Sequence, residues 1–437
     1  MSQSNPSGLT RRSLLKTVSA GAGLAAVSSA PVTPLFGGVA PSERITLGFI
    51  GIGKMNSSHL EAFSREEDVE ILALCDVESE RLDRGRDIVS AAYQKAGRPG
   101  KSASWRPDAY RDFRDLLARA DIDAVVIATP DHWHAITSIC ACRAGKDVYC
   151  EKPLANSIGE ARAMVEAAAR YGRVFQTGSM QRSDRTFRFA CELARNGRLG
   201  QIHTVHVNVG GPPQDCFLAA EPCPRTLDWN LWLGPAPERP YHSLLCPMDN
   251  WKVFPAWRDY REFGGGGMTD WGAHHFDIAQ WGLGMDTSGP VEIIPPELSD
   301  KKLLAYRYAN GVTMYHGGAP DGVGTEFIGT RGRVGVNRSG FLKCDPPQLR
   351  AEIIRPQDIQ LYASAEHRRD WLECIKKRSV PICPAETGCR SVTVCHLGNI
   401  AYQLKRTLRW DPVQEKFIGD EKANQLIHRP FRSPWTL

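Results

Sequence analysis

The chain has 437 residues, of which 42% are hydrophobic and 24% are charged, and these values are typical of a globular protein. The net charge of +5 is spread thinly, with no long Lys/Arg run and no aromatic residues interleaved with one, which argues against a nucleic-acid-binding protein. At this length we expect two domains, each with its own hydrophobic core.

The first forty residues resemble a twin-arginine export signal. Arg11 and Arg12 precede a weakly apolar stretch of small residues from about 18 to 30. We therefore expect residues 1–40 to be a signal segment, the twin-arginine export machinery to be a partner, and the protein to be periplasmic. Proline follows both candidate cleavage ends, which leaves open whether the leader stays as an anchor. A basic, unstructured N-terminus is the alternative, and no other stretch approaches the ~20 apolar residues of a spanning helix.

Strands and helices alternate between residues 45 and 177. The predicted strands are 45–50, 69–75, 124–128, 148–150 and 173–177, and the predicted helices are 57–65, 78–96, 110–119, 134–144 and 158–171. Because the connections are short, this alternation predicts an α/β Rossmann domain with a doubly wound parallel sheet over residues 44–180.

The second half, residues 181–437, has a different pattern. Its predicted strands are 202–209, 305–308, 312–316, 326–328 and 349–354, and its predicted helices are 269–283, 364–377 and 386–406, with an irregular tail after 410. A Trp/Pro-rich segment runs from Pro212 to Trp257. We expect an α+β substrate-binding and oligomerisation domain with a large, mostly antiparallel open sheet, whose C-terminal helices could pack back on the Rossmann domain.

Thirteen cysteines are scattered without zinc-like spacing. Most should be small buried hydrophobes. Cys216, Cys223 and Cys246 lie in the Trp/Pro-rich segment, and a disulfide among them is left open for an oxidising compartment.

A glycine turn lies between the first predicted strand and helix. Gly51 permits the tight turn, and Gly53 lets backbone amides approach a pyrophosphate, as in dinucleotide-binding sites. Asn56 replaces the third glycine of the motif, which weakens it. Asp76 ends the second strand near the expected offset of ~20 residues, where its carboxylate could accept the ribose hydroxyls. The predicted cofactor residues here are Gly51, Gly53, Lys54, Met55 and Asp76.

An acid at position 76 would repel a 2′-phosphate, so NAD is favoured over NADP. Arg81, nearby on the following helix, keeps NADP open. The alternative to a cofactor site is an ordinary turn with a helix-capping Asp.

The run Ala128 to His134 follows another parallel strand. Thr129 and Pro130 would line the floor beneath the nicotinamide ribose. His132 and His134 suggest a metal, but no third and fourth ligand stand at a zinc-like spacing, so we expect no metal and a capping or ring-packing role for each.

Glu151-Lys152-Pro153 follows the strand 148–150, where an open α/β sheet keeps its ligand crevice. A nearby nicotinamide cation and the loss of water would both disfavour the ammonium form of Lys152 and make it a usable proton donor or anchor. Ordinary loop chemistry is the alternative for this tripeptide alone.

A glycine run, residues 264–267, precedes a predicted helix that carries Asp270 and His274. Their i, i+4 spacing places them on one face, where a carboxylate could orient the imidazole as a general base. His275 and Asp277 could be outer partners, and the alternative is a capped amphipathic helix with a satisfied histidine.

Together these motifs resemble the Gfo/Idh/MocA oxidoreductases, named for glucose–fructose oxidoreductase and inositol dehydrogenase. The resemblance spans about residue 44 to the C-terminus. It implies that Lys152, Asp270 and His274 are catalytic, and that His134, Glu151 and Lys152 join Thr129 and Pro130 at the cofactor. It also implies a homodimer or homotetramer.

The remaining substrate pocket is predicted from side-chain type. Gln181 and Arg182 leave the last parallel strand towards the cleft, and Arg258 and Tyr260 stand among tryptophans before the glycine run. Aromatic rings and guanidinium groups suit a carbohydrate, although buried aromatics of an interdomain core are an equal alternative. The predicted substrate residues are Gln181, Arg182, Arg258, Tyr260 and His275.

We therefore expect an NAD(P)-dependent oxidoreductase that acts on a sugar, glycoside or polyol, with the cofactor tightly bound. His274, assisted by Asp270, would remove a hydroxyl proton while Lys152 holds the oxygen. Two alternatives remain: an NAD-dependent glycosidase that works through a transient 3-keto sugar, and a non-catalytic sugar-binding protein of the same fold.

Overall fold

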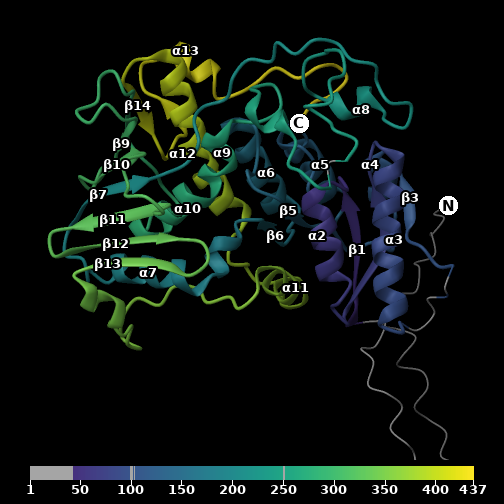
Figure 1. The fold of residues 1–437 in the computed structure, drawn as a ribbon, viewed down its shortest axis with the longest axis horizontal. Coiled ribbons are helices and arrows are strands. Elements are labelled where there is room, and N and C mark those ends of the chain that lie inside the picture. The colour runs from purple at the N-terminus through teal and green to yellow at the C-terminus, as the bar shows by residue number, and fades with distance from the viewer. Residues whose placement is uncertain (1–42, 99–101, 103, 250) are drawn as a thin grey trace, which may run out of the picture. The chain divides into compact units, whose positions relative to one another are not determined.

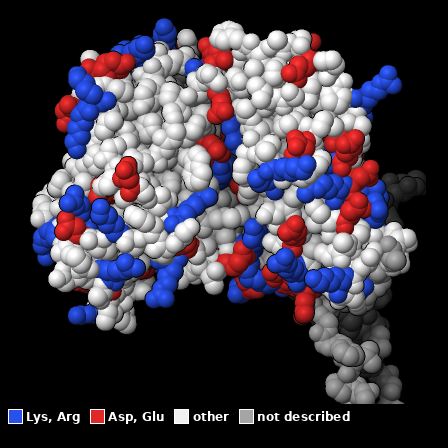
Figure 2. Space-filling model, viewed as in Figure 1, with Lys and Arg blue, Asp and Glu red and all other residues white. Residues whose placement is uncertain are grey.

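The computed structural model describes residues 43–98, 102, 104–249 and 251–437. The predicted export signal lies outside these residues. Within the described part of the chain, no helix has the length and apolar content needed to cross a membrane. On the face shown in Figure 2, acidic and basic side chains are interspersed.

The first half forms a six-stranded sheet in the order β3-β2-β1-β4-β5-β6, and every pair in it is parallel (Figure 1). Its strands are β1 (Ile45–Ile50), β2 (Val69–Cys75), β3 (Asp108–Tyr110), β4 (Ala124–Ile127), β5 (Asp147–Cys150) and β6 (Phe175–Thr177). Strands β4 and β5 are fully buried and, apart from Asp147 at the start of β5, lack charged residues, as expected for a parallel sheet covered on both faces. The predicted Rossmann sheet is confirmed.

Helices connect these strands. They are α2 (Lys54–Phe63), α3 (Ser79–Lys95), α4 (Phe113–Leu117), α5 (Asp131–Arg143) and α6 (Ile158–Arg170). Side-chain caps start three of them: the carboxylate of Glu78 accepts from backbone amides at the start of α3, Asp112 at α4 and the Ser157 hydroxyl at α6. The order β1-α2-β2 places the glycine turn at the carboxyl end of the sheet, where ligands of such folds bind.

The second half forms a nine-stranded sheet in the order β13-β12-β11-β7-β10-β9-β8-β14-β15. Its strands are β7 (Ile202–Val207), β8 (Glu292–Ile294), β9 (Ala305–Arg307), β10 (Thr313–His316), β11 (Thr325–Gly329), β12 (Gly332–Asn337), β13 (Phe341–Asp345), β14 (Leu408–Asp411) and β15 (Lys416–Phe417). All pairs are antiparallel except β7 with β10. The predicted open, mostly antiparallel sheet is confirmed.

The other helices pack around this sheet and against the first half. They are α7 (Arg185–Arg195), α8 (Trp229–Leu233), α9 (Gly267–Asp270), α10 (Gly272–Leu283), α11 (His367–Lys377), α12 (Ala385–Leu404) and α13 (Glu421–Gln425). Helix α12 packs against both α6 and α10. Trp371 and Leu372 of α11 lie in one core cluster with Leu47 and Phe49 of β1. Two C-terminal helices therefore pack against elements of the first half.

Several predicted elements are wrong. Residue 110, predicted to begin a helix, ends the edge strand β3, and the helix there is only α4. The segment 349–354 was predicted as a strand, but residues 349–351 belong to the 3₁₀ helix Pro347–Ala351, and residues 352–354 that follow it form no strand. The tail after residue 410 is not irregular, because it contributes to β14, β15 and α13.

All thirteen cysteines are free thiols, and all lie among the described residues. The disulfide left open among Cys216, Cys223 and Cys246 is therefore not formed. Cys246 is buried and its sulfur accepts a hydrogen bond from Arg81 at 3.1 Å.

Candidate active site

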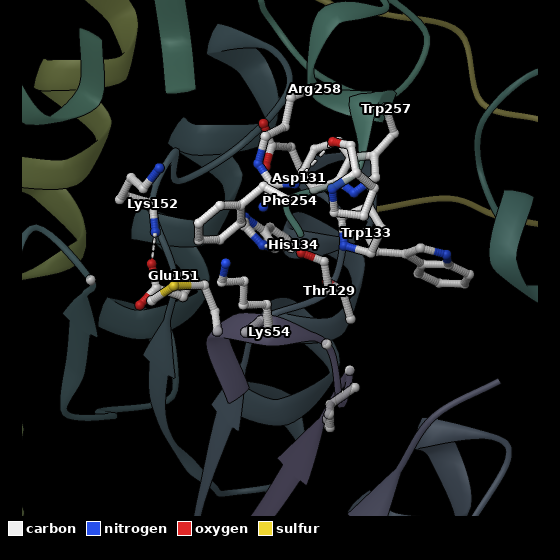
Figure 3. A pocket seen from close by; sticks show the side chains of 18 of the residues that line it. Lys54, Thr129, Asp131, Trp133, His134, Glu151, Lys152, Phe254, Trp257 and Arg258 are labelled. Carbon is white, nitrogen blue, oxygen red and sulfur yellow. Dashed lines mark hydrogen bonds between the residues drawn. The ribbon is translucent and has the colours of Figure 1, made fainter. Parts of the chain in front are cut away.

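A cavity of about 680 Å³ extends from the glycine turn to the start of the helix pair α9–α10 (Figure 3). It is lined by side chains from both halves of the chain. Most of the predicted site residues lie on its wall: Gly51, Gly53, Lys54, Met55, Asp76, Thr129, Pro130, His134, Glu151, Lys152, Gln181, Arg258, Asp270 and His274. Arg182, Tyr260 and His275 are not part of this lining.

The glycine turn has the geometry that a dinucleotide site requires. Gly51 has φ +81°, and a Cβ built there would lie 2.8 Å from the backbone nitrogen of Thr129, so a side chain is excluded on two grounds. Asn56 is fully buried, and its Nδ2 donates to the carbonyl oxygens of Ile50 at 3.1 Å and Gly51 at 2.6 Å. The residue that departs from the motif thus braces the turn in place of a third glycine.

Gly53 caps the N-terminus of α2, and no side chain occupies the free amides there. Such a terminus attracts phosphate groups because its N–H groups and helix dipole both face the ligand. The open cradle beside Gly51 and Gly53 therefore fits the pyrophosphate of a dinucleotide.

Asp76 lies on the cavity wall with its carboxylate already engaged. Its Oδ2 accepts from the backbone N–H of Ile52 at 2.6 Å, and its Oδ1 accepts from that of Glu78 at 2.9 Å. Burial raises the pKa of this carboxyl, against the lowering effect of the Arg81 guanidinium. The Arg81 guanidinium donates to the Pro247 carbonyl at 2.8 Å and to the Cys246 thiol. The residue that left NADP as an alternative is therefore bound to protein groups.

The Trp/Pro-rich segment (Pro212–Trp257) lies against this end of the cavity. Lys54 Nζ donates to the Lys252 carbonyl at 2.8 Å, and the Arg84 guanidinium lies 4.6 Å from the ring centroid of Trp251. Backbone bonds add to these contacts, since Ser79 N–H donates to Thr226 and Asp228 N–H donates to Val77. The segment contributes cavity-lining side chains: Leu231, Trp232, Leu245, Cys246, Phe254, Pro255 and Trp257. It therefore holds the dinucleotide end of the cavity from the side opposite the sheet.

Most of the tryptophans considered for sugar stacking pack within the segment itself. Trp229 and Trp232 stack with ring centroids 4.5 Å apart, and both contact the core cluster that also holds Trp257. Tyr260 belongs to this cluster and is buried. Its predicted contact with substrate therefore has no support in the geometry.

The floor of the cavity is held by two histidines. His134 Nδ1 lies 2.8 Å from the Pro153 carbonyl oxygen and Nε2 lies 3.0 Å from that of Thr129, so its ring fixes two cavity-lining loops. His132 Nε2 lies 3.0 Å from the Trp232 carbonyl oxygen. Burial lowers the pKa of both rings, that of His132 to about 3. Each ring has the packing role considered above, and no metal-ligand cluster occurs among the described residues.

Lys152 joins the two halves at the other end of the cavity. Its Nζ donates to Asp270 Oδ1 at 2.8 Å and to the Asp270 backbone carbonyl at 2.9 Å. Arg258 Nε lies 3.5 Å from the same carboxylate oxygen. Burial raises the pKa of Asp270, but the charges of Lys152 and Arg258 outweigh it and lower the pKa overall. Asp270 is therefore ionised at neutral pH and orients the ammonium.

The predicted pairing of Asp270 with His274 is not formed in the structure. The carboxylate and the backbone carbonyl of Asp270 both accept from Lys152, and the His274 backbone N–H donates to the Trp271 carbonyl, where α9 gives way to α10. His274 Nδ1 is buried without a hydrogen-bond partner among the described residues. Burial, followed by the positive charges of Lys152 and Arg338, holds the pKa of His274 well below its ordinary value. His274 is thus a neutral imidazole that faces the cavity.

Glu151 supports this end of the cavity from below. Its Oε1 lies 2.9 Å from His59 Nε2, and Arg368 Nε donates to His59 Nδ1 at 2.9 Å. Burial raises the pKa of Glu151, but the His59 contact and nearby positive charges outweigh it and lower the pKa. A Cβ on Gly178 would lie 2.8 Å from the Glu151 carboxyl carbon, so this packing requires glycine. The carboxylate positions the Lys152 loop and is turned towards protein partners.

The structure separates the neighbours Gln181 and Arg182. Gln181 lines the cavity, where its Oε1 accepts from Arg338 Nε at 3.3 Å. Arg182 has only 2% of its side chain exposed and forms ion pairs with Asp277 at 2.8 Å and Asp286 at 2.7 Å. Its prediction as a substrate residue is wrong, because the 3₁₀ turn Met180–Ser183 directs adjacent side chains differently and Arg182 belongs to a buried ion network.

His275 also lies away from the cavity. Its Nδ1 lies 3.2 Å from Thr325 Oγ1, and burial lowers its pKa to about 4. This prediction is wrong as well, since α10 turns His275 towards the nine-stranded sheet rather than the site.

Three cavity-lining residues did not emerge from the sequence. Trp271 is 44% exposed, and the Arg338 guanidinium lies 4.7 Å from its ring centroid. Arg338 comes from the β12–β13 turn, which no local pattern connects to this site. Asp131, the first residue of α5, lies within the motif Thr-Pro-Asp at a strand exit and could have been selected on that ground.

Comparisons with known proteins agree with this geometry. Residues 45–179 match the family model described as "Oxidoreductase family, NAD-binding Rossmann fold", and residues 214–437 match "Oxidoreductase family, C-terminal alpha/beta domain". The fold and the site define an NAD-binding oxidoreductase. The chain belongs to the Gfo/Idh/MocA oxidoreductase family.

Individual relatives match smaller parts of the chain. A glycosyl hydrolase family 109 protein of Shewanella baltica is 37% identical over 137 residues, which is 31% of this chain and 28% of that protein. An inositol 2-dehydrogenase of Salmonella paratyphi B is 30% identical over 172 residues, or 38% of this chain and 47% of that protein. The alignments thus span less than half the length of these relatives.

Solved structures share the fold over most of the chain. The WlbA dehydrogenase from Bordetella pertussis, in complex with NADH and UDP-GlcNAcA, has a TM-score of 0.58 at 20% identity, covering 84% of this chain and 98% of that one. The aldose-aldose oxidoreductase from Caulobacter crescentus, complexed with glycerol, has a TM-score of 0.55 at 20% identity, covering 84% and 99%.

Proposed function

We propose that this protein is an NAD-dependent oxidoreductase that moves a hydride between the nicotinamide and a hydroxyl-bearing carbon of a sugar, glycoside or polyol. The observation that carries the proposal is the placement of Lys152, Asp270 and His274 on the wall of the cavity that begins at the glycine turn. A proton-handling group and a dinucleotide cradle in one cavity are what carbinol oxidation requires.

The residues that would hold the cofactor are the amides at Gly51 and Gly53, the Asp76 carboxylate, and the floor formed by Thr129 and Pro130. When bound, the nicotinamide accepts and returns a hydride. Asp76 and the engaged Arg81 support NAD rather than NADP, because a 2′-phosphate would meet a carboxylate and the Arg81 guanidinium is bound to the Pro247 carbonyl.

Lys152 would hold the reacting oxygen, since Asp270 keeps its ammonium fixed at the cavity wall. His274 would take the hydroxyl proton, because it lines the cavity as a neutral imidazole, which has one ring nitrogen able to accept a proton. Trp271 and Arg338 would contact the rest of the substrate: an exposed indole packs on a sugar face, and a guanidinium reaches hydroxyl groups.

The test is a panel of polyols, free sugars and glycosides, with reduced nicotinamide followed by absorbance. Lys152→Ala should lower kcat by about 10²- to 10³-fold, the range for loss of one group that stabilises charge on the reacting oxygen. Lys146→Ala is the matched control, since the Lys146 ammonium also donates two hydrogen bonds, to the backbone carbonyls of Arg119 and Ile122, but lies outside the cavity. Unchanged turnover in Lys152→Ala would contradict the assignment.

A redox-neutral glycosidase is the second candidate, and two observations favour it. Relatives that match the chain bear the name glycosyl hydrolase family 109. The Trp/Pro-rich segment against the cofactor end supports a dinucleotide that stays bound between turnovers. Release of p-nitrophenol from p-nitrophenyl glycosides without net formation of reduced nicotinamide would establish this activity and exclude the plain dehydrogenase.

We also propose that the protein is exported through the twin-arginine pathway as a homo-oligomer. The paired arginines at 11 and 12 support export of a folded, cofactor-loaded chain. Cell fractionation of the native chain and of a variant with both arginines changed to lysine would test export. Light scattering of the purified protein would test its oligomeric state.

A further inference from the structure

Asp131 is a buried carboxyl without a partner inside the cavity. Only 3% of the residue is exposed, and no hydrogen bond or ion pair joins its carboxyl to another described residue. Its oxygens are not among the fully buried polar atoms, so they are open to the cavity, where a bound ligand can supply the hydrogen-bond partner that the protein does not.

The Asp131 carboxyl does not cap the helix that it begins. Asp131 is the first residue of α5, after the N-cap residue Pro130, and no hydrogen bond joins its carboxyl to a backbone amide of the described first turn. The backbone N–H of His132 instead donates to the Phe263 carbonyl at 3.2 Å, and that of Trp133 to Pro130. The carboxyl is thus left to the cavity, beside Arg258 and Phe254 (Figure 3).

Charges of both signs face this carboxyl from the surrounding elements. The positive groups are Arg258 and Lys152, and the negative groups are Asp270 and Glu151. Lys152 and Arg258 both contact the Asp270 carboxylate, and among the described residues neither forms an ion pair with Asp131. The other titratable neighbours are the Cys150 thiol behind it and His132 and His134 on its own helix.

Burial raises the pKa of Asp131 to about 8, with the Asp270 and Glu151 charges acting in the same direction and Arg258 and Lys152 opposing it. A carboxylic acid kept neutral at pH 7 differs from a carboxylate in one respect that matters for recognition: it donates a hydrogen bond.

We infer that Asp131 is a substrate-facing acid, protonated at neutral pH, that donates a hydrogen bond to an oxygen of the bound sugar, glycoside or polyol. The inference rests on the proposed function, because that substrate supplies the oxygen. It adds a specificity residue to Lys152 and His274, and it favours substrates with an acceptor oxygen next to the reacting carbon.

Two substitutions separate a donor from an acceptor at this position. Asp131→Asn keeps a donating N–H₂ group of the same shape, whereas Asp131→Ala removes the group. We expect Asp131→Ala to lower kcat/KM by about 10- to 100-fold, the effect of one lost buried hydrogen bond, and Asp131→Asn to stay within about fivefold of the native chain. The native activity should fall as pH rises through 8, and this alkaline limb should be absent from Asp131→Asn. An Asp131→Asn variant as impaired as Asp131→Ala, or one that keeps the alkaline limb, would overturn the inference.

An infrared titration tests the protonation state without turnover. The native protein at pH 6.5 should show the carbonyl stretch of a protonated carboxyl that Asp131→Asn lacks, and that signal should fade as pH rises through 8. Asp259→Asn, which removes an exposed carboxyl on the adjacent 3₁₀ helix Ala256–Asp259, should leave it unchanged. If Asp131 is ionised at pH 6.5, the inference is wrong even if the enzyme is active. If Asp131 is protonated but the protein turns over no sugar, glycoside or polyol, the proposed function is wrong instead.

Discussion

Lys152 Nζ donates two hydrogen bonds to one residue, Asp270, through its carboxylate at 2.8 Å and its backbone carbonyl at 2.9 Å. The lysine follows β5 of the parallel sheet, and the aspartate ends α9 in the second half of the chain. The pair therefore positions the ammonium and also connects the two halves at the cavity.

The first prediction concerns this pair. Asp270→Asn removes the charge that orients the ammonium but keeps the size of the side chain. We expect kcat to fall by about 10²-fold or more, with a smaller change in KM, because the defect lies in the position of the Lys152 ammonium at the reacting oxygen rather than in substrate binding. Steady-state kinetics on the best substrate of the panel would measure this. Asp345→Asn, which breaks an exposed ion pair with Arg333, is the control and should change neither constant. If Asp270→Asn also lowers the thermal unfolding midpoint so far that the variant is partly unfolded in the assay, the loss of kcat would reflect a purely structural role.

The second prediction concerns retention of the cofactor by the Trp/Pro-rich segment. Arg81→Ala removes the bonds to Cys246 and Pro247, and we expect NAD to dissociate about 10- to 100-fold faster, since a charge-assisted hydrogen bond contributes about 1.5–3 kcal/mol. Release can be followed by dilution and mass analysis of the retained nucleotide.

Arg86→Ala is the matched control for this experiment. Arg86 lies on the same helix, α3, and donates to the Pro107 carbonyl at 2.9 Å, outside the Trp/Pro-rich segment. Its loss should leave release unchanged. Equal release rates in both variants and the native chain would show that the segment does not hold the cofactor.

The parallel sheet could be predicted because its strands are short buried apolar runs that end on chemically distinctive residues. Strand β1 ends at the glycine turn and β2 ends one residue before Asp76. The edge strand β3 could not, because its three residues are largely exposed and carry no apolar pattern. Strands at an edge pair with only one neighbour, so their sequences are less constrained.

The candidate site divides in the same way. Gly51, Lys152 and Asp270 were predictable since each follows a strand or a glycine run that fixes its position. The i, i+4 pairing of Asp270 with His274 is not formed, because the Asp270 carboxylate binds Lys152 from the first half of the chain, a tertiary contact that a local spacing does not reveal. Arg338 reaches the cavity only through the β12–β13 turn, a tertiary contact that no local pattern encodes.

The third prediction follows from the buried network around Arg182. Its guanidinium is bound by Asp277 and Asp286, and Ser391 Oγ donates to Asp277 at 2.6 Å. Removing one partner of a buried pair leaves an uncompensated charge, so Arg182→Met should destabilise the fold by about 3–5 kcal/mol. The KM for substrate should not change at a temperature where the variant is folded. A raised KM with unchanged thermal stability would restore Arg182 as a substrate residue.

The fourth prediction concerns stability and pH at Asp131. Its folded pKa of about 8 lies above the unfolded value of about 3.9, so the folded state holds a proton that the unfolded state has lost between these limits. Stability from this group is complete below pH 4 and is lost as pH rises to 8, at about 1.4 kcal/mol per pH unit. The asparagine in Asp131→Asn cannot ionise, so this variant does not show the pH-dependent loss of stability.

With both proteins free of cofactor, Asp131→Asn should therefore unfold at a higher temperature than the native protein at pH 7. The difference should be smaller at pH 5. We expect the difference in thermal unfolding midpoint between Asp131→Asn and the native protein to be larger at pH 7 than at pH 5 by about 2 °C or more. Other titrating groups are common to both chains and largely cancel in the comparison. An advantage that is the same at pH 5 and pH 7 would mean that Asp131 ionises alike in the folded and unfolded states. The carboxyl would then be a carboxylate at neutral pH and could accept hydrogen bonds but not donate one.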